Sequence, residues 1–188
     1  FKYVDLAAKE AEVVFRTSGT SLGEQRRGRH LVSSLSLYRA SLAPPFREYV
    51  MAGRERLRFL SLVPSPKAAP DSSLAYMVAT AADQFATESH WLLDARGKLD
   101  KAMVRSLMRT VSDAGEPVLI VGTALSFLHL IDCFEKDVPG PLPIGSRIME
   151  TGGFKSSSRQ TTRDELRQRL FEVTGIPGER VVNEYGMT

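Results

Sequence analysis

The stretch PVLIVGTALSFLHLIDCF, residues 117–134, joins a strand to a helix with almost no loop between them. Residues 117–122 form an unbroken apolar run of the length that buried strands have. Thr123 then stands where a helix N-cap is expected, and an apolar helix follows it at once. A buried strand that leads directly into a helix is the unit from which parallel sheets with covering helices are built. The stretch therefore predicts an α/β fold.

The same alternation of strand and helix extends to both sides of this unit. Apolar runs predict strands at 12–16 and 57–63, a short strand with a turn within 89–98, and strands that open the segments 146–155 and 180–188. Residues 138–145 are rich in proline and glycine and predict an irregular loop. Together these signals predict a mainly parallel β-sheet flanked by helices, in a single domain over 1–188.

Helices are predicted from apolar spacing and from end signals. Residues 31–43 have a helical pattern that Pro44 and Pro45 are expected to interrupt. A helix over 100–114 is expected to end at Gly115. Ser72 or Ser73 is expected to cap a further helix, whose apolar side consists of Leu74, Met77, Val78, Ala81 and Phe85.

One more helix is predicted near the C-terminal end of the sequence. Thr162 and Glu165 have the spacing of a capping box, in which each side chain bonds the backbone of the other residue. The helix that they open is expected to bury Leu166, Leu170 and Val173 and to end at Gly175.

Composition limits the class of protein. The 188 residues suit one domain with a real core, and 25 basic against 22 acidic residues give a net charge of +3. That charge is too small to argue for nucleic-acid binding by itself. No apolar run approaches the roughly 20 residues of a membrane span, and no signal peptide is visible. The single cysteine excludes an internal disulfide, and a reducing cytoplasmic location is expected.

The histidines and the cysteine predict no metal site. His30, His90 and His129 are scattered without ligand spacing. His129 lies in the apolar run after Thr123, where we expect a satisfied core residue rather than a catalytic one. Cys133 in the same run is expected to be a small buried hydrophobe.

Three glycine-containing bends follow predicted strands, at 17–29, 151–155 and 184–188. Ligands of open parallel sheets bind beyond the carboxyl ends of the strands, so the architecture would let these bends converge. The first bend contains small hydroxyl residues and glycines, which suit a backbone nest for phosphates, followed by a cluster of arginines. The Walker A pattern is not met, because Gly19 and Gly23 are one residue too close and no Lys-Ser/Thr pair follows. A flexible surface loop is the alternative for this bend.

The other two bends are compatible with a flat ring. Gly152 and Gly153 would allow close approach of a ring to the backbone, although a simple tight turn is the alternative. Tyr185 could stack on a base and the Thr188 hydroxyl could reach a phosphate, although a tyrosine at a strand end also fits a core position.

The order of these motifs resembles the adenylate-forming superfamily of acyl and aryl ligases. TSGTSLG, residues 17–23, matches its phosphate loop, and NEYGMT, 183–188, matches its adenine and magnesium motif. Further stretches, among them ETGGFK (150–155) and IPGERVVNEYGMT (176–188), resemble the acyl-protein synthetase family. That family is the fatty-acid-activating component of bacterial luminescence and is similar to phenylacetate–coenzyme A ligases.

The resemblance implies an ATP-dependent acid–thiol ligase. It would activate a carboxylic acid, fatty in this family, as an acyl-adenylate and transfer it to a thiol acceptor, either coenzyme A or a protein cysteine, with a reductase as a further partner. Mg²⁺ would be required, with its principal ligand expected just after Thr188. The resemblance also implies a central piece of a larger N-terminal domain whose catalytic lid lies elsewhere, so the 188 residues alone are expected to have little or no activity.

The resemblance assigns roles to individual residues. The predicted phosphate-binding residues are Thr17, Ser18, Gly19, Thr20, Ser21 and Gly23. The predicted adenine-binding residues are Gly152, Gly153, Asn183, Glu184 and Tyr185. Thr188 is the predicted catalytic residue near the α-phosphate, and Gly122 and Thr123 are predicted, more loosely, to shape the acyl pocket. A nucleotide-binding scaffold without catalysis is the alternative, and nucleic-acid binding through residues 26–30 is a third.

Overall fold

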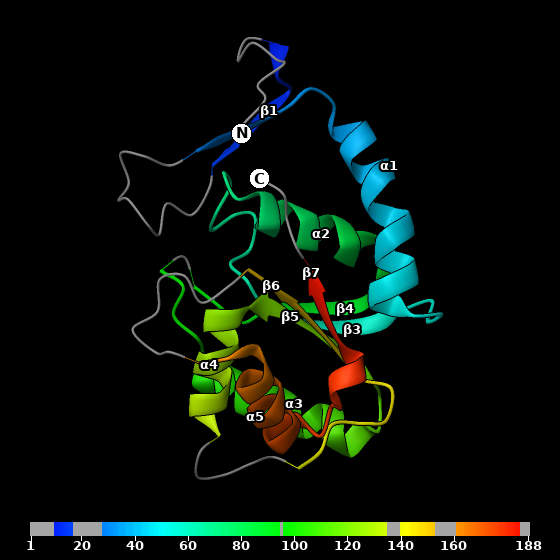
Figure 1. The fold of residues 1–188 in the computed structure, drawn as a ribbon, viewed down its shortest axis with the longest axis vertical. Helices are drawn as coiled ribbons and strands as arrows, with labels where there is room; N and C mark the ends of the chain where they lie inside the picture. The colour runs from blue at the N-terminus through cyan, green and yellow to red at the C-terminus, as the bar shows by residue number, and fades with distance from the viewer. Residues whose placement is uncertain (1–9, 17–27, 95, 135–139, 153–160, 185–188) are drawn as a thin grey trace.

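The computed structural model describes residues 10–16, 28–94, 96–134, 140–152 and 161–184. Within these residues, five parallel strands form one sheet in the order β4-β3-β5-β6-β7, with helices on both of its faces (Figure 1). The strands are β3 (Leu57–Leu62), β4 (Ala86–Trp91), β5 (Val118–Thr123), β6 (Arg147–Thr151) and β7 (Val181–Glu184). The predicted α/β fold with a mainly parallel sheet is confirmed.

Helical segments alternate with the strands along the chain. They are α1 (Leu35–Pro45), the π-helix η3 (Phe46–Met51), α2 (Ser73–Phe85), α3 (Lys101–Ala114), α4 (Ala124–Cys133), α5 (Arg163–Thr174) and the short 3₁₀ helix η4 (Gly178–Arg180). The predicted signals at their ends are confirmed. Ser72, Thr123 and Thr162 are N-caps, and Gly115 and Gly175 are left-handed C-caps.

Two hydrophobic layers hold the sheet between its helices. Val118 and Ile120 of β5 belong to the layer under α3, α4 and α5, while Leu119 and Val121 face α2 and η3. All four of these side chains are at most 1% exposed. Because both faces are covered, the central strand is apolar at consecutive positions rather than at alternate ones.

The strand at the beginning of the chain does not join this sheet. β1 (Val13–Arg16) pairs antiparallel with β2 (Arg29–Val32) in a separate two-stranded ribbon of the described residues. The prediction that 31–43 is wholly helical is wrong at its start, since Leu31 and Val32 belong to β2 and the helix begins at Leu35 after the N-cap Ser34. A local helical pattern could not reveal this, because the pairing partner of β2 lies more than ten residues earlier.

Pro44 and Pro45 do not interrupt the helical path, contrary to prediction. α1 ends at Pro45, but the chain continues directly into η3, and Pro45 itself has helical angles of φ −66° and ψ −33°. Proline removes a hydrogen-bond donor without forbidding a helical φ. Phe46 then stacks on Phe85 of α2 with ring centroids 5.6 Å apart, and this packing favours continuation.

His129 is exposed on α4, so the expectation of a core histidine is wrong. The helix presents Leu125 and His129, four residues apart, to the outside, while Phe127, Leu128 and Leu130 are buried. Cys133 is 3% exposed, as expected.

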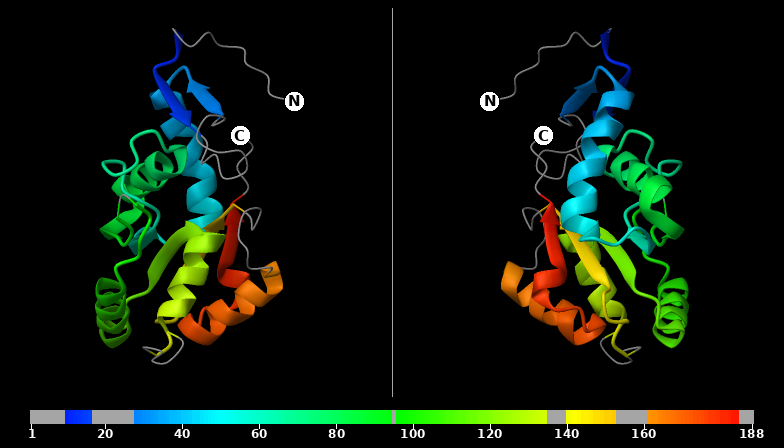
Figure 2. Two further views of the ribbon diagram at one scale, coloured as in Figure 1. Left: turned by 90° about the vertical axis from the view of Figure 1, so that its left-hand side faces the viewer. Right: turned by 90° about the vertical axis from the view of Figure 1, so that its right-hand side faces the viewer.

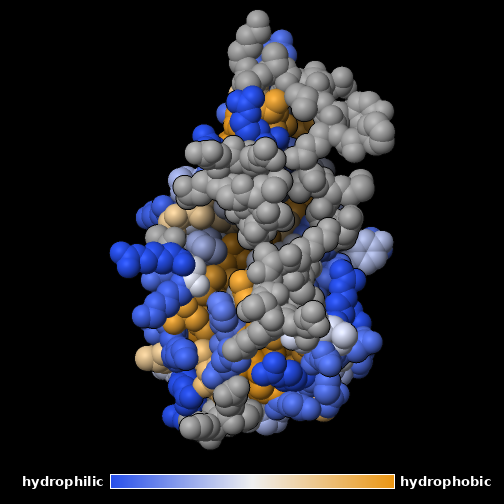
Figure 3. Space-filling view, turned by 60° about the vertical axis from the view of Figure 1, so that its left-hand side comes forward, coloured by the Kyte–Doolittle hydropathy of each residue, from blue (hydrophilic) through white to orange (hydrophobic). Residues whose placement is uncertain are grey.

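The described surface is mostly hydrophilic on the face shown in Figure 3, with hydrophobic side chains visible between the polar ones. In the part of the chain that the structure describes, no helix combines the length and the apolar character needed to cross a bilayer.

Candidate functional site

The carboxyl ends of three neighbouring strands bring part of the predicted site together. The register pairs there are Gly122 with Glu150, Thr123 with Thr151, Glu150 with Asn183, and Thr151 with Glu184. We call residues 122–123, 150–152 and 183–184 the carboxyl edge. It contains every described residue of the predicted adenine and acyl sites, and it is the position at which open parallel sheets bind ligands.

Two side-chain hydrogen bonds connect β6 to β7 at the carboxyl edge, one on each face of the sheet. Asn183 Nδ2 donates to Glu150 Oε2 at 2.8 Å, and Thr151 Oγ1 donates to Glu184 Oε2 at 2.6 Å. Side chains of successive residues point to opposite faces, so the first pair lies on the α4–α5 side and the second on the α1–α2 side. At the carboxyl edge, β6 and β7 are therefore joined by hydrogen bonds between polar side chains rather than by packing of apolar ones.

Gly152 continues from β6 in a conformation that favours glycine. Its φ is +82°, and a Cβ placed on it would meet no atom of the described residues within 4 Å. No described side chain covers the backbone at this point, which suits the close approach of a flat group. Gly153, predicted to act with it, lies outside the described residues.

Gly122 and Thr123 have clear structural roles at the end of β5. A Cβ on Gly122 would lie 2.7 Å from Ser126 Oγ and 2.9 Å from Leu62 Cβ, so only glycine fits there. Thr123 Oγ1 accepts a hydrogen bond from Ser126 N at 3.2 Å, and Ser126 Oγ accepts one from Thr123 N at 2.8 Å. These contacts hold α4 against the sheet, and a role in an acyl pocket stays a prediction.

An aromatic cluster lies near the end of β7, on the α1–α2 side. Tyr38 of α1 and Tyr76 of α2 have ring centroids 5.7 Å apart, and Phe15 of β1 lies 5.4 Å from Tyr76. Burial raises the pKa of the Tyr38 phenol, and the Glu184 carboxylate and Tyr76 raise it further. Tyr38 is thus close enough to Glu184 for their charges to interact.

The aromatic cluster also attaches the β1–β2 ribbon to the rest of the molecule. Phe15 is 1% exposed, and Arg16 N donates to Asp71 O at 2.7 Å, in the loop between β3 and α2. That loop leaves the sheet at the carboxyl end of β3. β1 accordingly points toward the edge at which β7 ends (Figure 2).

Most of the predicted nucleotide site lies outside the described residues. This holds for Thr17, Ser18, Gly19, Thr20, Ser21, Gly23, Gly153, Tyr185 and Thr188. The expected convergence of three bends is therefore visible only through the strands that precede them. β6 and β7 end side by side, whereas β1 ends in the ribbon rather than in the parallel sheet.

Sequence reasoning missed Glu150 and the pair Tyr38 and Tyr76. Glu150 had a usable signal, since it is a carboxylate in the short strand 147–151, whose neighbours Ile148 and Met149 are apolar. The two tyrosines had none, because they lie on different helices and meet only in the folded chain. Among the residues that the structure describes, no group of three or more His, Cys, Asp or Glu side chains could hold a metal ion.

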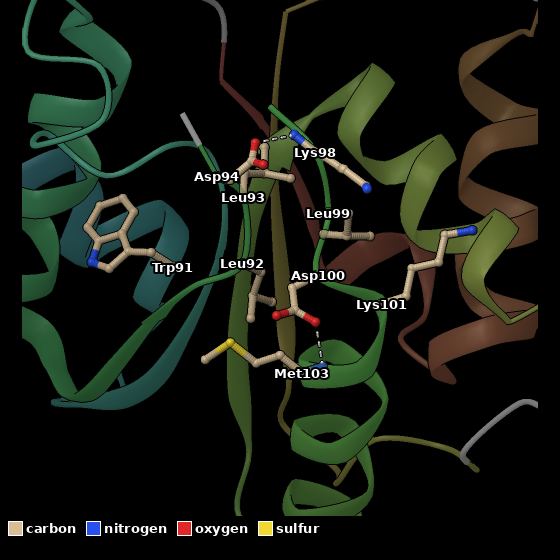
Figure 4. A pocket seen from close by; sticks show the side chains of 9 residues that line it. All are labelled: Trp91, Leu92, Leu93, Asp94, Lys98, Leu99, Asp100, Lys101 and Met103. Atoms are coloured by element: carbon tan, nitrogen blue, oxygen red, sulfur yellow. Dashed lines mark hydrogen bonds between the residues drawn. The ribbon is translucent and has the colours of Figure 1, made fainter. Parts of the chain in front are cut away.

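A hollow of about 530 Å³ lies beside the end of β4 and the start of α3 (Figure 4). Asp94 Oδ1 accepts hydrogen bonds from the backbone N–H groups of Arg96 and Lys98, both at 2.8 Å. Asp100 is the N-cap of α3 and accepts from Met103 N at 2.9 Å. These carboxylates shape a turn and a helix end, and no described residue of the predicted site lines the hollow.

The fold is similar to that of two larger proteins of known structure. One is the fatty acyl-adenylate ligase from L. pneumophila, solved in complex with acyl adenylate and pyrophosphate, with 12% identity, a TM-score of 0.57, and coverage of 92% of this chain and 28% of that chain. The other is apo MatB from Rhodopseudomonas palustris, with 15% identity, a TM-score of 0.55, and coverage of 100% of this chain and 31% of that chain.

At these identities the similarity shows a shared fold. The chain spans less than a third of the length of either protein. No protein-family model and no curated protein matches the sequence.

Proposed function

We propose that the chain is the nucleotide-binding core of an ATP-dependent ligase that activates a carboxylic acid as an acyl-adenylate. The observation that carries the proposal is the carboxyl edge, where β6 and β7 pair Glu150 with Asn183 and Thr151 with Glu184, and Gly152 directly follows this end of β6. The motif order supports the same reading, as does a fold shared with a protein that holds acyl adenylate and pyrophosphate. A fatty acid as substrate and a thiol as acceptor, the acyl-protein synthetase reaction, are the finer parts of the proposal.

The carboxyl edge fits an adenine ring. Bare backbone at Gly152 gives room for a flat base, and the Asn183 amide provides hydrogen-bonding groups at its edge. Tyr185 would stack on the base and Gly153 would complete the slot. The acyl pocket would be bordered by Gly122 and Thr123.

The phosphates would lie toward the N-terminal ribbon. Residues 17–23 directly follow Arg16, which the hydrogen bond to Asp71 O ties to the carboxyl side of β3. Backbone N–H groups in a glycine-containing turn can hold the β- and γ-phosphates, and the Thr188 hydroxyl would approach the α-phosphate. Mg²⁺ would neutralise phosphate charge during the reaction.

The chemistry in this proposal is two substitutions. A carboxylate oxygen of the acid attacks the α-phosphorus, the bond to the β-phosphate oxygen breaks, and pyrophosphate leaves with the bonding electrons. A thiolate sulfur then attacks the acyl carbon, and AMP leaves. The protein contributes by positioning the reactants and by stabilising charge with preorganised donors.

Exchange of labelled pyrophosphate into ATP tests the proposal on the full-length protein, with fatty, aryl and short-chain acids supplied in turn. We expect exchange that depends on one class of acid, and its abolition in Gly19→Val, while the urea midpoint is unchanged. Gly178→Val is the matched control, because a Cβ at Gly178 meets no atom of the described residues within 4 Å and the position lies at the amino side of β7.

Two results would count against the proposal. Nucleotide binding without exchange for any acid would indicate the scaffold alternative. Exchange at the wild-type rate in Gly19→Val would remove the phosphate-loop assignment.

A further inference from the structure

Glu150 is a buried carboxylate whose side chain accepts one hydrogen bond from the described residues. Its side chain is 3% exposed, at the end of β6, and Oε2 accepts a hydrogen bond from Asn183 Nδ2 at 2.8 Å. The other oxygen, Oε1, is also buried and has no hydrogen-bond partner among the described residues. Burying a carboxylate is unfavourable unless hydrogen bonds compensate, so its presence here needs an explanation.

The carboxylate determines which way the Asn183 amide faces. An Asn side chain has a donating NH₂ group on one side and an accepting oxygen on the other, and either can face a given partner. An ionised carboxylate only accepts hydrogen bonds, so it selects the NH₂ group. The same Nδ2 also lies 3.5 Å from the Glu150 backbone oxygen, so one side-chain oxygen and the backbone oxygen of Glu150 both lie near the amide nitrogen.

It follows that Asn183 Oδ1 is directed away from Glu150 and is left as an acceptor. Asn183 is only partly buried, and it pairs in register with Glu150, two residues before Gly152, whose backbone no described side chain covers. A ligand in that space meets an oxygen with a fixed orientation. Such an oxygen binds an N–H donor and repels a carbonyl oxygen.

We infer that Glu150 is a positioning residue that makes the site selective for a purine with a 6-amino group. By holding the NH₂ group of Asn183, it presents Oδ1 to the exocyclic amine of adenine and disfavours the 6-oxo group of hypoxanthine. The inference rests on the proposed function, in which a nucleotide base lies along Asn183. Glu150 itself does not touch the base.

The test compares ATP with ITP, which has a 6-oxo group in place of the 6-amino group. In pyrophosphate exchange with the full-length wild-type protein, we expect kcat/KM to be higher for ATP than for ITP. Glu150→Ala frees the amide to turn, so the ratio of the two kcat/KM values should fall by about fivefold to tenfold, the range expected for one oriented hydrogen bond. Glu150→Gln can donate as well as accept, so it no longer selects one orientation of the Asn183 amide, and the ratio should fall part of the way toward that of Glu150→Ala.

Ser146→Ala is the matched control for loss of a buried polar contact in the same strand region. Ser146 is 1% exposed and its Oγ accepts from Val118 N at 3.1 Å, at the opposite end of the sheet. This variant should lose stability and keep the wild-type ratio. Side-chain amide NMR of Asn183, assigned with Asn183→Asp, provides a readout that does not depend on activity. Its NH₂ resonances should shift in Glu150→Ala and in Glu150→Gln, and stay close to wild type in Ser146→Ala.

The outcomes separate two kinds of failure. A wild-type ATP:ITP ratio in Glu150→Ala, with exchange intact, overturns the role of Glu150 and leaves the proposed function standing. Absence of exchange by the wild-type protein with every acid and both nucleotides overturns the proposed function, and base selection with it. If Glu150→Ala does not fold, Glu150→Leu takes its place, and unchanged Asn183 amide resonances in that variant would likewise refute the positioning role of Glu150.

Discussion

Replacing Gly122 with alanine should destabilise the protein, because three atoms occupy the place of the new methyl group. A Cβ at this position would lie 2.7 Å from Ser126 Oγ, 2.9 Å from Leu62 Cβ and 3.2 Å from Phe127 Cε2. Carbon atoms in ordinary contact are about 3.5–4.0 Å apart, so all three neighbours must move. Leu62 is held by the register of β3 against β5, and Ser126 by its capping box with Thr123.

The magnitude follows from two opposing effects. Overpacking a close-packed interior costs about 1–3 kcal/mol. Exchange of glycine for alanine at a compatible position also restricts the unfolded chain, which stabilises by about 0.4–1 kcal/mol. Gly178→Ala provides the second effect without the first, because within the part of the chain that the structure describes its Cβ meets no atom within 4 Å. The difference in free energy of unfolding between the two variants should therefore be the overpacking cost, about 1–3 kcal/mol.

Urea denaturation followed by circular dichroism measures this difference. Gly122→Ala should unfold at a lower urea concentration than Gly178→Ala, with a similar slope, since the surface exposed on unfolding is nearly the same. Equal midpoints for the two variants would refute the packing argument. They would mean that the ends of β3 and β5 can separate freely, and that α4 is not held in place by the contact at Gly122.

Three further predictions concern single titratable groups. The pKa of Glu165 is lowered, first by the backbone hydrogen bond from Thr162 N and then by the Thr162 side chain. The contribution of this carboxylate to stability should be present above the unfolded pKa of about 4.3 and be lost as the pH falls through the lower folded pKa. Wild type and Glu165→Gln should therefore differ in urea midpoint at neutral pH and converge in acid. Burial raises the pKa of Cys133 and covers its thiol, so a thiol reagent at mildly alkaline pH should label the native chain more slowly than the urea-unfolded chain. Equal labelling rates would contradict its burial. Burial and then Glu184 raise the pKa of Tyr38. Tyr38→Phe should therefore remove a late component of the alkaline tyrosinate titration, and Glu184→Gln should move that component to lower pH. Identical titration curves for wild type and Glu184→Gln would show that Tyr38 and Glu184 do not interact.

Part of the carboxyl edge could be predicted from sequence. The family resemblance predicts Gly152, Asn183 and Glu184 as residues of a nucleotide site, and the structure brings the ends of their strands side by side, while the binding role stays a prediction. Glu150 was missed because its importance depends on Asn183, 33 residues away, and on the register between β6 and β7. That register is a property of the assembled sheet.

Local sequence determined the elements themselves. A cap such as Ser72 or Thr123 acts on backbone groups two or three residues away, and a buried strand such as β5 is recognisable from its own apolar run, so neighbouring residues contain the whole signal. Only the tertiary structure decided that β1 pairs with β2 outside the sheet, that the chain stays helical past Pro45, and that Glu150 accepts a hydrogen bond from Asn183. Each of these features depends on contacts between segments that are distant in sequence. Such contacts contribute to stability only when the folded chain brings the segments together, so no local stretch of sequence reveals them.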